Sequence, residues 1–152
     1  MKIALAQINP TVGDLKGNQE KIEQFFLKAK ASGAELVVFP EMAVCGYPPR
    51  DLLCMPEFIS QCQLALDSLI SRLHGPAVLC GHVMKLETGR GLANAATLFQ
   101  DGNILARARK ILLPDYDVFD EMRYFEPGDK VTVCSLNGVR VGISICEDIW
   151  NL

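Results

Sequence analysis

Short apolar runs alternate with amphipathic stretches along the first half of the chain, a pattern typical of strands and helices that follow one another. The runs 2–8, 35–39 and 77–82 are short and nearly all apolar, which predicts strands that are covered on both faces. Apolar residues recur at helical spacing over 18–32 and 58–73, so we expect an amphipathic helix in each stretch. This order predicts two strand–helix units followed by a third strand.

The second half of the chain has the pattern of two hairpins. Runs 94–99 and 104–109 flank an Asp-Gly pair, and runs 131–136 and 139–145 flank an Asn-Gly pair. Both dipeptides suit tight turns that need positive φ. Strand–helix units followed by hairpins predict a single domain of the α/β class, with a mixed sheet and helices on at least one face.

Composition and charge narrow the function classes without selecting one. Of the 152 residues, 49% are hydrophobic and 22% are charged, with a net charge of −3, which is typical of a globular domain. The charges are scattered, so nucleic acid is not an expected partner. No apolar run approaches the roughly 20 residues that cross a bilayer, and no signal peptide is recognisable. We therefore expect a cytoplasmic protein without a membrane partner.

The chain has six cysteines and two histidines, with no Cys-x-x-Cys pair and no spacing typical of zinc ligands. A metal site is not expected. Without a secretory signal, the cysteines are predicted to be free thiols that pack as small apolar groups.

Three reactive side chains each come just after a predicted strand: Glu41, Lys110 and Cys146. Strand ends at one edge of a sheet can converge in space, so the three could form one site. Each also has an ordinary structural interpretation, as a solvated glutamate, a lysine that covers surface and a core cysteine.

Cys146 differs from the other cysteines in its C-terminal neighbours, because Glu147-Asp148 breaks the apolar strand and suits the first turn of a helix. Backbone N–H groups at such a turn, with a nearby cation, lower a cysteine pKa and favour the thiolate that attacks a carbonyl carbon. The same groups could bind the oxyanion that forms. The remaining cysteines are expected to be structural: Cys45, Cys54, Cys62, Cys80 and Cys134.

Other chemistries have less support in the sequence. His74 lies beside a predicted helix end and His82 beside a predicted strand end, neither within a motif, so a Cys–His enzyme is only an alternative. Gly142-x-Ser144-x-Cys146 lacks the last glycine of a nucleophile elbow. No glycine-rich phosphate loop is present.

The ordered set Glu41, Lys110 and Cys146 resembles the Glu-Lys-Cys triad of the nitrilase superfamily of carbon-nitrogen hydrolases. The surrounding residues resemble the glutaminase domain of glutamine-dependent NAD synthetases over essentially the whole chain. The stretches that carry this likeness are Pro40-Glu41, Gly46-Tyr47-Pro48-Pro49-x-Asp51-Leu52-Leu53, Lys110-x-x-Leu113-Pro114-x-Tyr116-x-Val118-Phe119-Asp120-Glu121-x-Arg123-Tyr124-Phe125 and Cys146-Glu147-Asp148-Ile149-Trp150.

This resemblance implies a nitrilase-like α-β-β-α sandwich and a role for each triad residue. Glu41 would be the general base, Lys110 would stabilise the oxyanion, and Cys146 would form a thioester with the γ-carbonyl of glutamine. The resemblance also implies that Glu121 lies beside the triad, with Tyr116 and Glu147 at the substrate. No cofactor is expected for this step.

The resemblance further implies a protein longer than this chain, which stops six residues after Cys146. Nitrilase-type domains are larger, and glutamine-dependent NAD synthetases add a domain that uses ATP and Mg. We therefore expect residues 1–152 to be the N-terminal part of a glutaminase domain, with little activity alone. In the full-length protein the expected partners are glutamine, the synthetase domain of the same chain and further copies in a homo-oligomer.

Two alternatives to a glutaminase that supplies ammonia for amidation of deamido-NAD stay open. One is a stand-alone nitrilase-type amidase that acts on another small amide. The other is an inactive piece that keeps the fold for a structural role.

Overall fold

The computed structural model describes residues 1–89 and 91–150. These residues form seven strands, two long α-helices and three short 3₁₀ helices. The helices are α1 (Leu15–Ala31) and α2 (Pro56–Arg72), with 3₁₀ turns η1 (Arg50–Cys54), η2 (Glu121–Arg123) and η3 (Cys146–Ile149). The strands are β1 (Ile3–Leu5), β2 (Leu36–Val38), β3 (Ala77–Lys85), β4 (Leu92–Gln100), β5 (Asn103–Arg109), β6 (Thr132–Leu136) and β7 (Val139–Ile143).

The first five strands form one mixed sheet in the order β1-β2-β3-β4-β5. β1, β2 and β3 are parallel, because α1 and α2 return the chain to the starting edge of the sheet. β4 and β5 then add antiparallel strands, and the turn at Asp101 and Gly102 joins them. The predicted two strand–helix units and the first hairpin are therefore confirmed. The expectation that the first strand is covered on both faces is wrong, because β1 lies at the edge of the sheet and its Ile3 and Leu5 are exposed.

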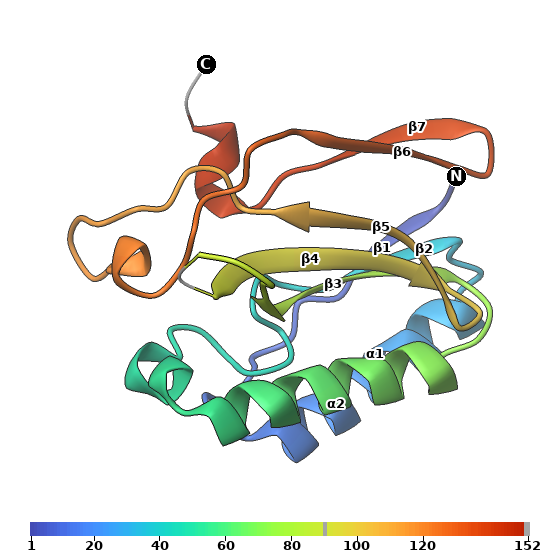
Figure 1. Cartoon of the computed structure of the whole chain (residues 1–152). Helices are drawn as coiled ribbons and strands as arrows, with labels where there is room; N and C mark the ends of the chain where they lie inside the picture. Colours follow the sequence, from blue (N-terminus) through green and yellow to red (C-terminus); the bar gives the residue numbers. More distant parts are fainter. Residues whose placement is uncertain (90, 151–152) are drawn as a thin grey trace.

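The elements stack in three layers, with α1 and α2 on one face of the five-stranded sheet and the β6–β7 hairpin over the other (Figure 1). A core that contains Ile22, Phe26 and Leu66 lies between the helices and the sheet. A second core, with Leu98, Leu136 and Ile143, lies between the sheet and the hairpin. The described residues thus form an α-β-β arrangement, which agrees with three of the four layers expected for a nitrilase-like sandwich.

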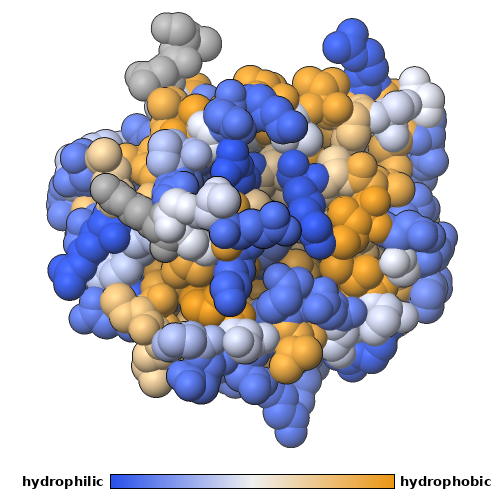
Figure 2. All heavy atoms as spheres, in the orientation of Figure 1, coloured by the Kyte–Doolittle hydropathy of each residue, from blue (hydrophilic) through white to orange (hydrophobic). Residues whose placement is uncertain are grey.

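Apolar side chains also reach the surface among polar ones, as the apolar patches in Figure 2 show. Three of the exposed apolar side chains lie in or next to the β6–β7 hairpin: Val131, Val133 and Val139. No helix in residues 1–89 and 91–150 is both long enough and apolar enough to span a membrane.

Both predicted tight turns are confirmed by their backbone angles. Asp101 and Gly102 have φ values of 48° and 80°, and Asn137 and Gly138 have values of 50° and 78°. Positive φ at both central residues is the geometry that matches the twist of a two-stranded hairpin.

Two boundaries differ from the sequence prediction for physical reasons. α1 begins at Leu15 rather than near residue 18, because the Asp14 carboxylate accepts the Gly17 N–H at 2.9 Å and caps the helix. β3 continues to Lys85 because it pairs with the whole of β4. The expectation that His82 lies beside a strand end is therefore wrong: His82 is buried within β3 and bonds to the Thr97 hydroxyl at 2.7 Å.

Gly81 in β3 allows the chain after β2 to pass close to the sheet. A β-carbon at this position would lie 2.5 Å from the Pro40 carbonyl oxygen and 2.7 Å from the Glu41 Cα. Only glycine permits such an approach between two backbones. The identity of residue 81 therefore helps to place Glu41.

Candidate active site

The structure brings Glu41, Lys110 and Cys146 to one place from three separate elements. Glu41 follows β2, Lys110 follows β5 directly, and Cys146 begins η3 just after β7. The Lys110 ammonium lies 2.9 Å from Glu41 Oε1. The Cys146 thiol lies close enough to Glu41 and Lys110 for both charges to act on its pKa. The residues that follow β2 and β5 are therefore in direct contact, and the turn after β7 lies beside them.

Lys110 lies between two carboxylates. Its side chain is fully buried, and its ammonium donates to Glu41 Oε1 at 2.9 Å and to Glu121 Oε1 at 2.8 Å. Burial by itself lowers the pKa of Lys110, but the hydrogen bonds from Lys110 to Glu121 and Glu41 outweigh burial, and the pKa is raised. Lys110 is therefore a fixed positive charge that holds the two glutamates in one cluster.

Asn94 and Tyr47 complete the cluster, and sequence reasoning did not single out either side chain. The Asn94 amide donates to Glu41 Oε1 at 2.6 Å and to Glu121 Oε2 at 3.3 Å. The Tyr47 hydroxyl donates to Glu121 Oε1 at 2.8 Å. A signal for Asn94 was present, since it is an amide within the apolar stretch Leu-Ala-Asn-Ala-Ala of a predicted buried strand.

The backbone at Cys146 has a φ of 46°, in the left-handed region that residues other than glycine seldom adopt. This sharp turn between β7 and η3 leaves Cys146 exposed beside the cluster. Strained backbone of this kind is common at functional residues. It sets the direction of the thiol relative to Glu41 and Lys110.

The expectation that the turn lowers the pKa of Cys146 is wrong. Partial burial of the sulfur raises the pKa of the Cys146 thiol, the Glu41 charge raises it further, and Lys110 offsets only part of the increase. The acidic residues that surround Lys110 thus outweigh its charge. A protonated thiol beside a carboxylate requires the carboxylate to act as a base before the sulfur can attack a carbonyl.

Asp148 ties the turn that carries Cys146 to the end of β5. Its Oδ1 accepts the backbone N–H groups of Ile111 and Leu112, each at 2.9 Å. Its Oδ2 accepts the N–H of Ile145 at 3.0 Å. One carboxylate therefore holds the residues that follow Lys110 and the residue that precedes Cys146.

The predicted substrate residues lie around the same cluster. Glu121 is buried against Lys110, whereas Tyr116 is exposed and donates its hydroxyl to Glu147 at 2.9 Å. The Tyr116 ring packs edge-on against Phe119. The hydrogen bond to Glu147 raises the pKa of Tyr116. Tyr116 and Glu147 thus form a polar pair at the open side of the site, next to Cys146.

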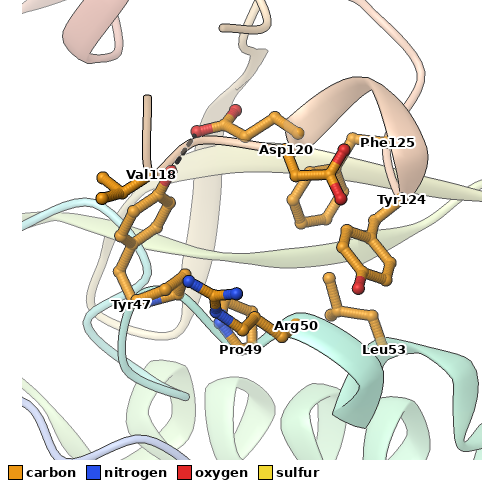
Figure 3. Close-up of a pocket in the computed structure, with 10 residues that line it drawn as sticks. Tyr47, Pro49, Arg50, Leu53, Val118, Asp120, Tyr124 and Phe125 are labelled. Atoms are coloured by element: carbon orange, nitrogen blue, oxygen red, sulfur yellow. Dashed lines mark hydrogen bonds between the residues drawn. The ribbon is translucent and has the colours of Figure 1, made fainter. Parts of the chain in front are cut away.

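A small pocket of about 30 Å³ adjoins the cluster on the side of Tyr47 and Glu121. Figure 3 shows the Tyr47 hydroxyl bonded to a carboxylate at one edge and the Tyr124 ring at another. Its lining is Tyr47, Pro48, Pro49, Arg50, Leu53, Val118, Asp120, Glu121, Tyr124 and Phe125.

The other cysteines agree only in part with the expectation that they pack as small apolar groups, because Cys54 lies at the surface. Cys45, Cys62 and Cys80 are buried, Cys134 is partly buried and Cys54 is exposed. All six thiols in the chain are free. Among residues 1–89 and 91–150, no group of three or more His, Cys, Asp or Glu side chains could hold a metal ion.

The sequence of this chain is similar to that of known proteins over nearly its whole length. Residues 2–151 match the carbon-nitrogen hydrolase family. The chain is 41% identical over 153 residues to a glutamine-dependent NAD(+) synthetase of Thermotoga maritima, covering 99% of this chain and 26% of the relative. It is 43% identical to the protein of that name from Synechocystis sp., covering 98% of this chain and 28% of the relative. The chain therefore spans about a quarter of the length of these curated relatives.

Solved structures share the fold. A glutamine-dependent NAD+ synthetase from Acinetobacter baumannii, in complex with ADP, superposes with a TM-score of 0.93 at 38% identity, covering 98% of this chain and 28% of that chain. The NitN amidase from Neterenkonia sp. AN1 superposes with a TM-score of 0.83 at 25% identity, covering 98% of this chain and 58% of that chain. The nitrilase-like fold predicted from the sequence is thus confirmed.

Proposed function

The chain belongs to the carbon-nitrogen hydrolase family, and from that premise we propose that its Glu41, Lys110 and Cys146 hydrolyse the side-chain amide of glutamine. The observation that carries the proposal is the buried Lys110 ammonium, 2.9 Å from Glu41, in a place where the charges of both residues act on the Cys146 thiol. These three groups supply a base, a cation and a nucleophile at one point.

The first half of the reaction forms a thioester. Glu41 takes the thiol proton, and the sulfur attacks the γ-carbonyl carbon of glutamine. Lys110 and the backbone N–H of Glu147 stabilise the oxyanion, and Glu41 returns the proton to the nitrogen as ammonia leaves. The raised pKa of Cys146 supports this order, because the thiol is protonated until the base acts.

The second half releases the acid. Glu41 removes a proton from water, the hydroxide attacks the thioester carbonyl, and the C–S bond breaks to give glutamate. The thiol regains its proton from Glu41, so that one amide and one water yield one carboxylate and one ammonia. Glu121 keeps Lys110 in place during both steps through its hydrogen bond at 2.8 Å.

The open side of the site suits an amino acid rather than a simple amide. Glu147 and Tyr116 are polar, paired at 2.9 Å and placed beside Cys146. A carboxylate there can bind the α-ammonium group of glutamine. The longer relatives named as glutamine-dependent NAD(+) synthetases support a coupled role, in which ammonia passes to a synthetase domain of the same protein that uses ATP and Mg.

The test uses the Cys146→Ala variant of the full-length protein. We expect it to lose glutamine-dependent synthesis of NAD while it keeps synthesis from added ammonium, because only the nucleophile is removed. Loss of both activities would contradict a modular arrangement.

A second measurement tests the substrate and the nucleophile together. A diazo-ketone analogue of glutamine should label Cys146, as shown by peptide mapping, and ammonia release should be faster from glutamine than from other ω-amides. Labelling of Cys80 or Cys134 instead would show that the assignment of the nucleophile is wrong. Equal rates with simple amides would favour a general amidase.

A further inference from the structure

We propose that Asn94 is a positioning residue that fixes which oxygen of Glu41 faces the Cys146 thiol; this inference rests on the proposed function. Asn94 is fully buried within β4, with apolar neighbours in its own strand. Its amide group bonds to both glutamates of the cluster, at 2.6 Å to Glu41 and 3.3 Å to Glu121.

The two carboxylates determine the orientation of the Asn94 amide. Rotation of the amide by half a turn would place its oxygen against two negatively charged oxygens, where the NH₂ group now donates both of its protons. The consequence is that Asn94 Oδ1 is buried and has no hydrogen-bond partner among the described residues. Buried acceptors without partners are unfavourable and rare in proteins. The side chain therefore gives up one acceptor to present two donors to the glutamates.

The donors to Glu41 converge on a single oxygen. Lys110 and Asn94 both donate to Oε1, at 2.9 Å and 2.6 Å. A carboxylate held by one donor can exchange its two oxygens by rotation about its last bond, but two donors on Oε1 prevent that exchange. Oε2 is thereby left to accept the proton of the Cys146 thiol, whose pKa the Glu41 charge raises.

The backbone of Asn94 supports the same arrangement. Its carbonyl oxygen accepts the Lys110 N–H at 2.8 Å. Residue 94 therefore places Lys110 through its main chain and the two glutamates through its side chain. Glu41 and Glu121 accept from its amide directly, while Lys110 and Tyr47 donate to those carboxylates in turn. The Glu41 and Glu121 charges also act on the Cys146 thiol.

The experiment compares the variants Asn94→Leu and Asn94→Asp with the variant Thr97→Val, each in the full-length protein. Leucine has a volume similar to that of asparagine but cannot donate a hydrogen bond. We therefore expect kcat for glutamine hydrolysis to fall about 100-fold in Asn94→Leu, as for a misplaced catalytic group. KM should change by less than about twofold. Thr97 is a matched control, because it is equally buried in β4 but bonds to His82 outside the cluster. Thr97→Val should keep the wild-type kcat.

The pH dependence separates positioning from simple packing. An aspartic acid at residue 94 can donate a hydrogen bond only while protonated, and its ionised form would repel Glu41 and Glu121. The activity of Asn94→Asp relative to wild type should therefore rise as the pH is lowered, whereas that of Asn94→Leu should not. The same ratio at every pH for both variants, or equal losses of kcat in Asn94→Leu and Thr97→Val, would overturn the proposal.

Failure of the proposed function can be told apart from failure of this inference. If the wild-type protein releases no ammonia from glutamine, the proposed function is wrong, and Asn94 is then judged by alkylation of Cys146 with iodoacetamide. We expect slower alkylation in Asn94→Leu than in wild type and Thr97→Val, because Glu41 no longer accepts the thiol proton efficiently. Equal alkylation rates in all three proteins would overturn the inference.

Discussion

At the scale of single residues, the site depends on how charges compensate one another in a buried place. Lys110 has no exposed side-chain surface, and the carboxylates of Glu41 and Glu121 are 19% and 4% exposed. Partial burial of the Cys146 sulfur and the charge of Glu41 raise the pKa of its thiol, and Lys110 offsets only part of the increase. The cluster therefore favours a protonated thiol with a base beside it over a preformed thiolate.

Replacement of Lys110 by methionine should destabilise the protein as well as inactivate it. Lys110→Met keeps the length of the side chain but leaves two carboxylates buried without a cation, which costs about 3–5 kcal/mol in free energy of unfolding. Urea unfolding measures the change, and ammonia release from glutamine measures the activity. Lys85→Met is the control, because Lys85 is exposed at the end of β3 and should change stability by less than about 0.5 kcal/mol. Similar stabilities of the two variants would contradict the buried ion cluster.

At the scale of elements, the site is assembled where strands end and loops are tied down. Asp148 joins η3 to the end of β5 through three backbone N–H groups. Gly81 lets the chain after β2 lie against β3. The spacing between Glu41, Lys110 and Cys146 is thus set by backbone contacts as much as by the side chains themselves.

The close contact at Gly81 predicts a selective effect of one methyl group. Gly81→Ala should lower the free energy of unfolding by about 1–3 kcal/mol and reduce amide hydrolysis, because the new β-carbon would displace Pro40 and Glu41 from positions 2.5–2.7 Å away. Gly142→Ala in β7 is the matched control, since its added β-carbon would meet nothing within 4 Å. Urea unfolding and ammonia release measure both variants. Equal behaviour of the two would show that the approach at residue 81 is not tight.

At the scale of the whole molecule, stability depends on a core that includes polar groups as well as the two apolar layers. His82 and Thr97 lie in neighbouring strands and bond to each other at 2.7 Å. Burial lowers the pKa of His82 to about 4, so the folded protein keeps this imidazole neutral. The chain therefore contains a buried base whose protonation favours unfolding.

The pH dependence of stability follows from that difference. An unfolded histidine binds a proton below about pH 6.5, whereas folded His82 does so only near pH 4. The contribution of His82 to stability is therefore full above about pH 6.5 and decreases as the pH falls toward 4, by up to about 3 kcal/mol.

A comparison of wild type with His82→Gln isolates this contribution from that of the carboxylates. We expect urea unfolding of the variant to depend less on pH between about 4 and 6.5, because glutamine can bond to Thr97 but does not titrate. Parallel curves for the two proteins would contradict a neutral buried His82.

The sequence by itself determined the strand–helix units, both hairpin turns and the three reactive residues at strand ends. These features are local: they depend on the spacing of apolar residues, on the Asp-Gly and Asn-Gly pairs, and on the residues around Glu41, Lys110 and Cys146. Local features can be recognised in the sequence before the fold is known. The length of β3 was not readable in this way, because pairing with β4 decided where it ended.

Tertiary structure alone decided the electrostatics of the site. The sequence suggested a lowered pKa for Cys146 from the turn that begins there, but partial burial of the sulfur and the charge of Glu41 raise that pKa. The same is true of Asn94, which is one amide in an apolar strand until folding places it 2.6 Å from Glu41. Distances between residues far apart in the chain set charge interactions and hydrogen bonds, and the order of residues along the chain does not contain those distances.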